Sequence, residues 1–159
     1  MTQSHDILIV GAGIYGATAA LTLNERGHRV AILDQGQIPH PLAASTDISK
    51  VVRLAYGDDV TYTALMEQAM PGWRAWNDLL GDTLYHETGT TMFTREPMSA
   101  GGYEYESYTL LTARGHTLER LDAQAIQSRF PAWHESYVDG FFHAEGGFVE
   151  SGRLVSALI

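Results

Sequence analysis

Three glycines, Gly11, Gly13 and Gly16, are spaced as Gly-x-Gly-x-x-Gly between an apolar run and a segment with helical periodicity. The first glycine permits a tight turn, the second lets the backbone approach a pyrophosphate, and the third allows a helix to pack closely on a strand. The helix N-terminus then presents free N–H groups and positive dipole charge to the anion. Asp34 follows Gly11 by 23 residues, where a carboxylate accepts hydrogen bonds from ribose hydroxyls and disfavours a 2′-phosphate. The pattern predicts a dinucleotide site that does not take NADP.

The elements that must position these residues form a βαβ unit. Residues 6–10 are a short apolar run rich in β-branched side chains, typical of a strand buried on both faces of a parallel sheet. Residues 15–26 carry small and apolar side chains at helical intervals, Gly27 is the expected C′ residue, and residues 29–33 form a second buried strand. Residues 1–57 are therefore expected to hold the N-terminal part of a Rossmann-like α/β domain.

Beyond Asp34 the pattern becomes mixed α+β. Residues 35–50 are polar, contain two prolines, and are expected to form a loop. Apolar and aromatic side chains at three- and four-residue steps predict a helix over 61–80, which Pro71 should kink or restart. The other elements expected are a strand at 88–94, helices at 103–114 and 122–129, and short strands at 137–143 and 147–149. Residues 58–145 are assigned to part of a second domain.

The final segment, residues 146–159, is expected to return to the first domain. Ser151 is a suitable N-cap for a helix over 152–159, which ends without a C-cap. Two parallel strands cannot bury both faces of a doubly wound sheet, and no third strand is evident to pair with them. The expected fold is therefore incomplete, and we expect the chain to be the N-terminal piece of a longer protein.

Composition narrows the possible partners. Ten Lys and Arg against 19 Asp and Glu give a net charge of −9, which disfavours a nucleic acid. The uncharged stretch 7–23 is shorter than the roughly 20 residues of a membrane span and lacks a basic flank, so we expect no membrane segment and a cytoplasmic protein. Cysteine is absent, and the seven histidines never lie three to five residues apart, so no metal site is predicted. His143 and Glu145, beside a glycine turn, are expected to be exposed.

Further segments give the glycine motif a more specific context. Together with the fingerprint over residues 6–34, the sequence Ala-Ser-Thr-Asp-Ile-Ser-Lys-Val-Val-Arg-Leu-Ala-Tyr-Gly at 44–57 resembles the D-amino-acid-oxidase-like superfamily of FAD enzymes. Within it the resemblance is to the monomeric sarcosine oxidase and N-methyltryptophan oxidase branch. Residues 129–131 and 146–158 are similar to the family's return from its substrate domain, to which 58–145 would belong. The resemblance spans nearly the whole chain.

The resemblance implies FAD as the cofactor and assigns roles to individual residues. The implied cofactor-binding residues are Gly11, Gly13, Ile14, Tyr15, Gly16, Asp34, Gln35, Ala44, Ser45, Ser49, Lys50 and Val51. Lys50 would lie close to the isoalloxazine and stabilise its negative charge on reduction, although the sarcosine oxidases usually have arginine at this position. Arg53 matches the arginine that holds the substrate carboxylate, and Tyr56 would line the same pocket. Lys50 and Arg53 are thus the implied catalytic residues.

The function implied is oxidation of a small amine or amino acid to an imine, with electrons passed to oxygen or another acceptor. Two alternatives stay open from the sequence. The dinucleotide can be NAD in a dehydrogenase, because NAD and FAD sites share the βαβ unit. The chain can also be an inactive fragment or a non-enzymatic nucleotide-binding module.

Overall fold

The computed structural model describes residues 4–133 and 136–159 and divides the chain into two units. The first unit contains the residues up to Lys50, Asp82–Leu84 and Val149–Ile159. The second contains Val51–Gly81 and Tyr85–Phe148. The domain bounds expected from the sequence, 1–57, 58–145 and 146–159, stay a prediction.

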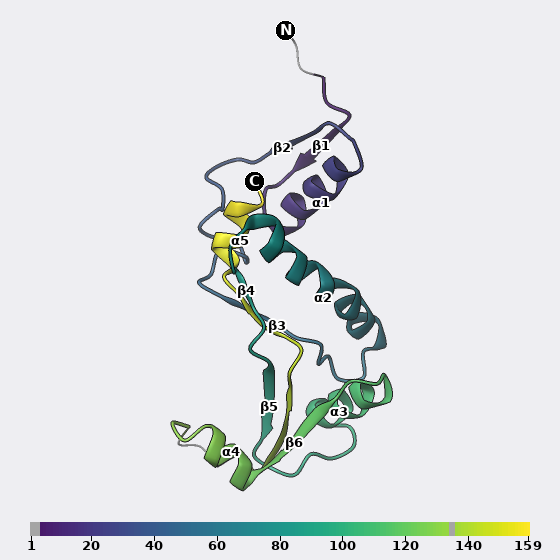
Figure 1. Cartoon of the computed structure of the whole chain (residues 1–159), viewed down its shortest axis with the longest axis vertical. Helices are drawn as coiled ribbons and strands as arrows, with labels where there is room; N and C mark the ends of the chain where they lie inside the picture. The colour runs from purple at the N-terminus through teal and green to yellow at the C-terminus, as the bar shows by residue number, and fades with distance from the viewer. Residues whose placement is uncertain (1–3, 134–135) are drawn as a thin grey trace. The chain divides into compact units, whose positions relative to one another are not determined.

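The first unit begins with the predicted βαβ arrangement. Strand β1 (Ile7–Val10) leads into helix α1 (Ile14–Glu25), and strand β2 (Val30–Leu33) follows. The two strands pair in parallel, from Ile7 opposite Val30 to Val10 opposite Leu33, and α1 lies beside them (Figure 1). Among the described residues these two strands form a sheet of their own. The α/β class and the parallel pairing are as the sequence predicted.

Burial of this small sheet differs from the prediction. The side chains of β1 alternate between half-buried and exposed, with Leu8 63% and Val10 80% exposed. Leu33, at the end of β2, is 57% exposed. The expectation of a strand buried on both faces is therefore wrong for the described chain, because α1 covers one side only.

The last helix, α5 (Ser151–Ala157), begins one residue earlier than predicted. Glu150 occupies the N-cap position, so the assignment of Ser151 as the cap is wrong. Ser151 is buried instead, and its Oγ donates a 2.8 Å hydrogen bond to the carbonyl of Asp47. The N–H of Gly152 donates to the same carbonyl at 3.2 Å. The start of α5 is thus fastened to the loop that precedes Lys50.

The second unit contains the longest helix, α2 (Val60–Leu80). The carboxylate of Asp59 caps it by accepting from the N–H of Tyr62 at 2.9 Å, and Gly81 ends it with φ +62°. The sequence predicted that Pro71 would kink or restart this helix. Pro71 lies within one continuous helix, so a restart is wrong. Across residues 4–133 and 136–159, no helix combines the length and apolar character that a membrane crossing needs.

An antiparallel sheet of order β5–β7–β6 forms the centre of the second unit. Its strands are β5 (Thr90–Thr94), β7 (Asp139–His143) and β6 (Leu118–Asp122), with helix α3 (Tyr103–Ala113) before β6 and helix α4 (Ala123–Arg129) after it. A second sheet has the order β3–β8–β4, from β3 (Lys50–Val52), β8 (Gly147–Val149) and β4 (Tyr85–His86). Strands β3, β4 and β6 were not predicted.

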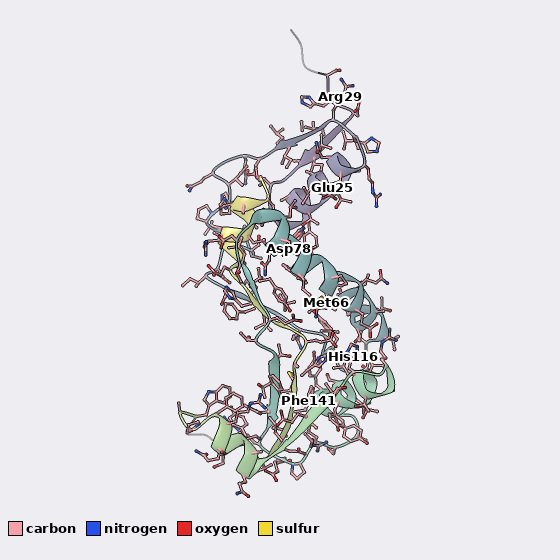
Figure 2. All side chains as sticks on the ribbon, viewed as in Figure 1. Glu25, Arg29, Met66, Asp78, His116 and Phe141 are labelled. Atoms are coloured by element: carbon pink, nitrogen blue, oxygen red, sulfur yellow. The ribbon has the colours of Figure 1, made fainter. Side chains whose placement is uncertain are left out.

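The core of the second unit is built around β7. Phe141, the middle residue of this strand (labelled in Figure 2), is 1% exposed. Its ring centre lies 5.6 Å from that of Tyr108 in α3. Leu111 and Leu121 are equally buried. Burying such side chains contributes about 1.5–3 kcal/mol each, so the contact between α3 and the sheet is a main source of stability.

Asp139, at the start of β7, joins three segments of the second unit. Its carboxylate accepts two hydrogen bonds from Arg120 in β6, at 2.6 and 2.5 Å, and bonds from the N–H groups of Met98 and Gly140, both at 2.8 Å. The Arg120 guanidinium lowers the pKa of Asp139 from its ordinary 3.8. Stability from this group is therefore complete above about pH 4 and is lost as the pH falls through the lowered folded pKa.

We expect Asp139→Asn to lower the free energy of unfolding by about 1–3 kcal/mol, because the amide presents N–H groups where the carboxylate accepted hydrogen bonds. Arg120 is 42% exposed, so solvent screening places the value in the lower part of this range. Denaturant unfolding at neutral pH measures the loss, which should shrink below about pH 4. Asp82→Asn is the matched control, since Asp82 and Arg153 are both at least half exposed. Equal losses in the two variants would contradict the role of Asp139.

Candidate functional site

The turn between β1 and α1 depends on two glycines. Gly11 has φ +103°, a conformation that favours glycine, and its N–H donates to the carbonyl of Leu33 at 2.8 Å. A Cβ added to Gly16 would lie 1.8 Å from the carbonyl oxygen of Gly11. Any side chain at position 16 would therefore prevent α1 from packing this closely against the turn.

The N-terminus of α1 is open to an anion. Gly13 is the N-cap, no side chain caps the helix, and no acidic residue lies in the first turn. A Cβ added to Gly13 would meet nothing within 4 Å. The first N–H groups of a helix have no acceptor within the helix, and here no side-chain cap accepts from them. These donors and the helix dipole suit a phosphate group bound next to Gly13.

Asp34, after β2, is fastened to the glycine turn. Its Oδ2 accepts from the N–H of Ala12 at 2.7 Å, and Oδ1 accepts from the N–H of Gly36 at 3.3 Å. The hydrogen bond from Ala12 is the main cause of a lowered pKa for this carboxyl, so it is ionised near neutral pH. Asp34 thus has a structural role that the sequence did not indicate. Its predicted contact with a ribose stays a prediction.

The other residues expected to bind a cofactor lie in α1 and in the segment after β2. Lys50 is half exposed, and its Nζ pairs with the carboxylate of Asp47, three residues earlier. Tyr15 is 90% and Val51 67% exposed. The remaining members are half-buried (Ile14 and Ser45) or exposed (Gln35, Ala44 and Ser49). Their exposure is compatible with contact to a ligand, and their roles stay predictions.

Arg53 and Tyr56, both expected to meet a substrate, lie together in the second unit. The Arg53 guanidinium carbon is 4.9 Å from the centre of the Tyr56 ring and 5.7 Å from that of Tyr103. Nη1 of Arg53 donates to the carbonyl of Ala55 and to the hydroxyl of Tyr103, both at 2.6 Å. Burial raises the pKa of Tyr56, so its hydroxyl is neutral near physiological pH. We call Arg53, Tyr56 and Tyr103 the arginine–tyrosine cluster.

Tyr103 is a member of this cluster that the sequence did not assign to a site. It is the first residue of α3 and is 41% exposed. Its hydroxyl also donates to the carbonyl of Ala55 at 2.8 Å. The Oγ of Ser107 accepts a 2.8 Å hydrogen bond from the N–H of Gly57, so α3 is fastened to residues 53–57. Arg53 and Tyr103 are 50 residues apart, and no local pattern indicates their contact.

The histidines give a result that sequence spacing did not predict. Three residues, His116, His143 and Glu145, each place one possible metal-ligand atom within 4.8 Å of the other two. The two histidines are 27 positions apart in the sequence, and the third residue is a glutamate. His143 is 2% exposed, so its expected exposure at a turn is wrong. Glu145 is 45% exposed, as predicted for a turn. His134 lies outside the described residues.

Comparison with protein families gives one match over nearly the whole chain. A family model described as FAD dependent oxidoreductase matches residues 6–159. Among curated proteins, N-methyl-L-tryptophan oxidase from Salmonella dublin is 28% identical over 161 aligned residues, and that from Salmonella typhimurium is 27% identical. Each alignment covers 97% of this chain and 41% of the relative. The chain thus spans about two-fifths of the length of these relatives.

Solved structures show the same fold. NikD, described as an unusual amino acid oxidase essential for nikkomycin biosynthesis, is 26% identical with a TM-score of 0.80, over 99% of this chain and 40% of NikD. Glycine oxidase from Geobacillus kaustophilus superposes with a TM-score of 0.83 at 22% identity, over 99% of this chain and 44% of that enzyme. The mixed α/β fold of this chain therefore matches part of these oxidase structures.

The glycine turn yields a prediction about stability. Gly16→Ala should lower the free energy of unfolding by about 1–3 kcal/mol, because the new methyl group overlaps the carbonyl of Gly11 and forces α1 away. Gly13→Ala is the matched control, since it has open space and loses only about 0.5 kcal/mol from a weaker cap. Thermal unfolding of the two variants measures the difference. Equal stability would mean that the close approach at Gly16 is relieved without cost.

Proposed function

The chain belongs to the FAD-dependent oxidoreductase family, and we propose that it supplies part of the FAD site and a carboxylate-binding arginine to an amine or amino-acid oxidase. The observation that carries this proposal is the uncapped N-terminus of α1 behind Gly13, in a chain whose residues 6–159 match the family. The relatives named N-methyl-L-tryptophan oxidase and the amino acid oxidase NikD support an amino-acid or amine substrate.

The first unit has the features that a dinucleotide requires. The open space at Gly13 admits a pyrophosphate, and the free N–H groups of α1 stabilise its charge. Asp34 keeps a carboxylate at the end of β2, where it can also accept from ribose hydroxyls. The family match favours FAD over NAD, so a dehydrogenase is not favoured.

Residues 44–51 are proposed to contact the flavin end of the cofactor. Ala44, Ser45, Ser49 and Val51 would line it, and Lys50 would hold a positive charge beside the ring. When bound, FAD supplies a two-electron acceptor for the hydride equivalent that leaves the carbon next to the substrate nitrogen. The resulting imine is released to water and hydrolysed. The Nζ of Lys50 pairs with Asp47 in the described chain, so Asp47 holds this ammonium group in position.

Arg53 is proposed to hold the carboxylate of the substrate. Its Nη1 is engaged by Ala55 and Tyr103, and the rings of Tyr56 and Tyr103 flank the guanidinium. These contacts fix the plane of the guanidinium before a substrate arrives, which lowers the entropic cost of binding. A fixed guanidinium then fixes the carbon that is oxidised.

Two further parts of the proposal concern the setting of the reaction. Oxygen is proposed as the final electron acceptor, in keeping with relatives that are named oxidases. The cytoplasm is the proposed location, as expected from the sequence. The proposed activity is that of a whole enzyme. The chain spans about two-fifths of the length of its curated relatives.

Gly13→Val tests the cofactor site. A branched side chain at the mouth of α1 occupies the space proposed for the pyrophosphate, so flavin affinity should fall about tenfold to 100-fold. The measurement is flavin absorbance retained after gel filtration of protein mixed with FAD. Gly72→Val is the control, because a Cβ at Gly72 also meets nothing within 4 Å but lies in α2. Full flavin retention by Gly13→Val would contradict the site.

Arg53→Lys tests the substrate site in the active enzyme. Lysine keeps the charge but loses the paired donors, so KM for an N-methyl amino acid should rise about tenfold to 100-fold. The flavin spectrum should not change. An amine without a carboxylate is the control substrate, and its KM should stay the same. A comparable loss with both substrates would show that Arg53 is structural.

A further inference from the structure

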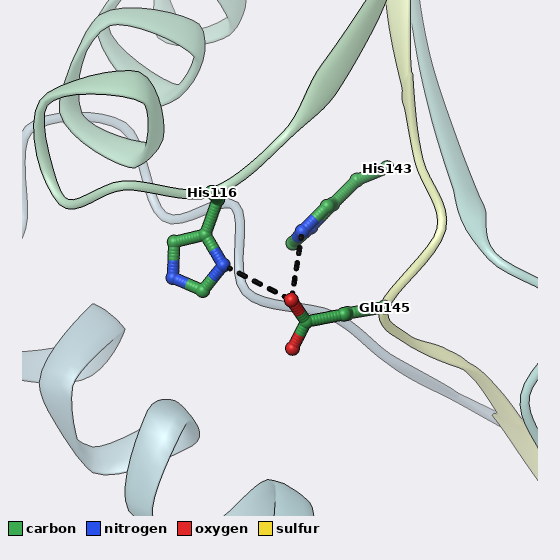
Figure 3. Close-up of side chains that lie close together, drawn as sticks. All are labelled: His116, His143 and Glu145. Atoms are coloured by element: carbon green, nitrogen blue, oxygen red, sulfur yellow. Dashed lines mark hydrogen bonds and ion pairs between the residues drawn. The ribbon is translucent and has the colours of Figure 1, made fainter.

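Three potential metal ligands meet in the second unit, and none of them is assigned to flavin or substrate. His116 lies between α3 and β6, His143 ends β7, and Glu145 lies in the turn between β7 and β8. Figure 3 shows both imidazole rings directed toward one carboxylate oxygen of Glu145. The distances to this oxygen are 3.4 Å from Nδ1 of His116 and 3.9 Å from Nε2 of His143. The fold thus gathers two imidazoles and a carboxylate from distant segments.

His143 is the unusual member of this group. Its side chain is 2% exposed, and neither ring nitrogen has a hydrogen-bond partner among the described residues. A buried polar atom without a partner typically costs about 1–3 kcal/mol, and most buried polar atoms have a partner. A neutral imidazole keeps a lone pair on one ring nitrogen, and in His143 no described donor uses it, so this nitrogen is available to a metal ion.

His116 is oriented by a second carboxylate. Its Nε2 lies 3.0 Å from Oε1 of Glu67, and Arg114 holds that carboxylate with bonds of 2.7 and 2.5 Å. The Arg114 guanidinium donates to both oxygens of Glu67, which marks this carboxylate as an acceptor. Nε2 of His116 therefore carries a proton, and in the neutral ring the lone pair of Nδ1 points at Glu145. In this tautomer two acceptors face each other at 3.4 Å, an arrangement that a cation between them would stabilise.

We propose that His116, His143 and Glu145 bind a divalent transition-metal ion of the zinc type. Bonds of about 2.0–2.2 Å in tetrahedral geometry place neighbouring ligand atoms roughly 3.3–3.5 Å apart. The 3.4 Å separation of His116 and Glu145 already fits, and binding requires Nε2 of His143, now 3.9 Å from the same oxygen, to move closer. Glu145 is 45% exposed, which gives the ion an entry path and leaves the fourth position to water.

The arrangement around Glu67 supports a metal site. A histidine ligand usually donates its other ring N–H to a carboxylate, which fixes the tautomer and directs the lone pair at the metal. Glu67 accepts from His116 in this way and is itself held by Arg114. The rival explanation is a protonated His116 that bridges Glu67 and Glu145. It accounts for His116 but leaves both nitrogens of the buried His143 without a hydrogen-bond partner among the described residues.

Calorimetric titration of ZnCl2 into chelator-treated protein without a polyhistidine tag tests the proposal. The unsubstituted protein should bind one zinc ion per chain. Glu145→Gln should weaken zinc binding at least about 100-fold, because an amide is a poor zinc ligand. Glu67→Gln should weaken it about tenfold to 100-fold through His116. Glu145 is half exposed, so its substitution leaves the buried core intact. Circular dichroism checks that each variant is folded.

Glu119→Gln is the matched control, since Glu119 lies in the same unit, is 58% exposed and pairs with Arg129. It should leave zinc affinity unchanged. Replacement of zinc by Co²⁺ gives a second measurement that does not depend on heat signals, because four-coordinate cobalt absorbs visible light strongly and Glu145→Gln should remove that absorbance. Absence of saturable binding would overturn the proposal and favour the protonated His116. Zinc affinity equal in the full chain, Glu145→Gln and Glu67→Gln would overturn it as well.

Discussion

The hydrogen bond from the N–H of Ala12 to the carboxylate of Asp34 holds together the part of the chain on which the cofactor proposal depends. It joins the end of β2 to the turn before α1, while the N–H of Gly11 binds the carbonyl of Leu33. Gly16 then lets α1 start directly against this turn. With the turn fixed from both sides, the first N–H groups of α1 point to one place, so the proposed anion would bind there without reordering the backbone. The carboxylate of Asp34 thus has a structural role that does not depend on a ligand.

Elements with a strong local signal were predicted well. The βαβ unit, α2 and α3 each carry their own periodicity, and their observed ends lie close to those expected. Strand β6 was missed because its sequence, Leu-Glu-Arg-Leu-Asp, is mostly charged and has no strand pattern of its own. It forms because β7 offers it a partner, with Leu121 opposite Gly140, and because Arg120 bonds to Asp139. Strand β3 has three residues and strand β4 has two, which is too short for a recognisable strand pattern in the sequence. They are strands because they pair with β8, not because of the β-propensity of their residues.

The same limit applies to the candidate sites. The glycine motif is contiguous, so spacing alone identified it. Arg53 and Tyr103 are 50 residues apart, and His116 lies 27 residues before His143, so neither contact has a local signature. Histidines three to five residues apart indicate a metal site only where its ligands come from one local segment. Here β6 and β7 are neighbours in an antiparallel sheet, with Leu118 opposite His143, and this pairing brings His116 to the end of β7.

Burial separates the polar groups that fold the second unit from those available for binding. Asp139 is buried, and its carboxylate is saturated by Arg120, Met98 and Gly140, so it has little capacity for a ligand. His143 is also buried, yet neither ring nitrogen has a hydrogen-bond partner in the described chain. A buried polar group without a hydrogen-bond partner lowers the stability of the folded state. A ligand that binds to this group raises the stability again. The half-exposed Glu145 beside it provides both the missing negative charge and access from solvent, which is the combination that a bound cation requires.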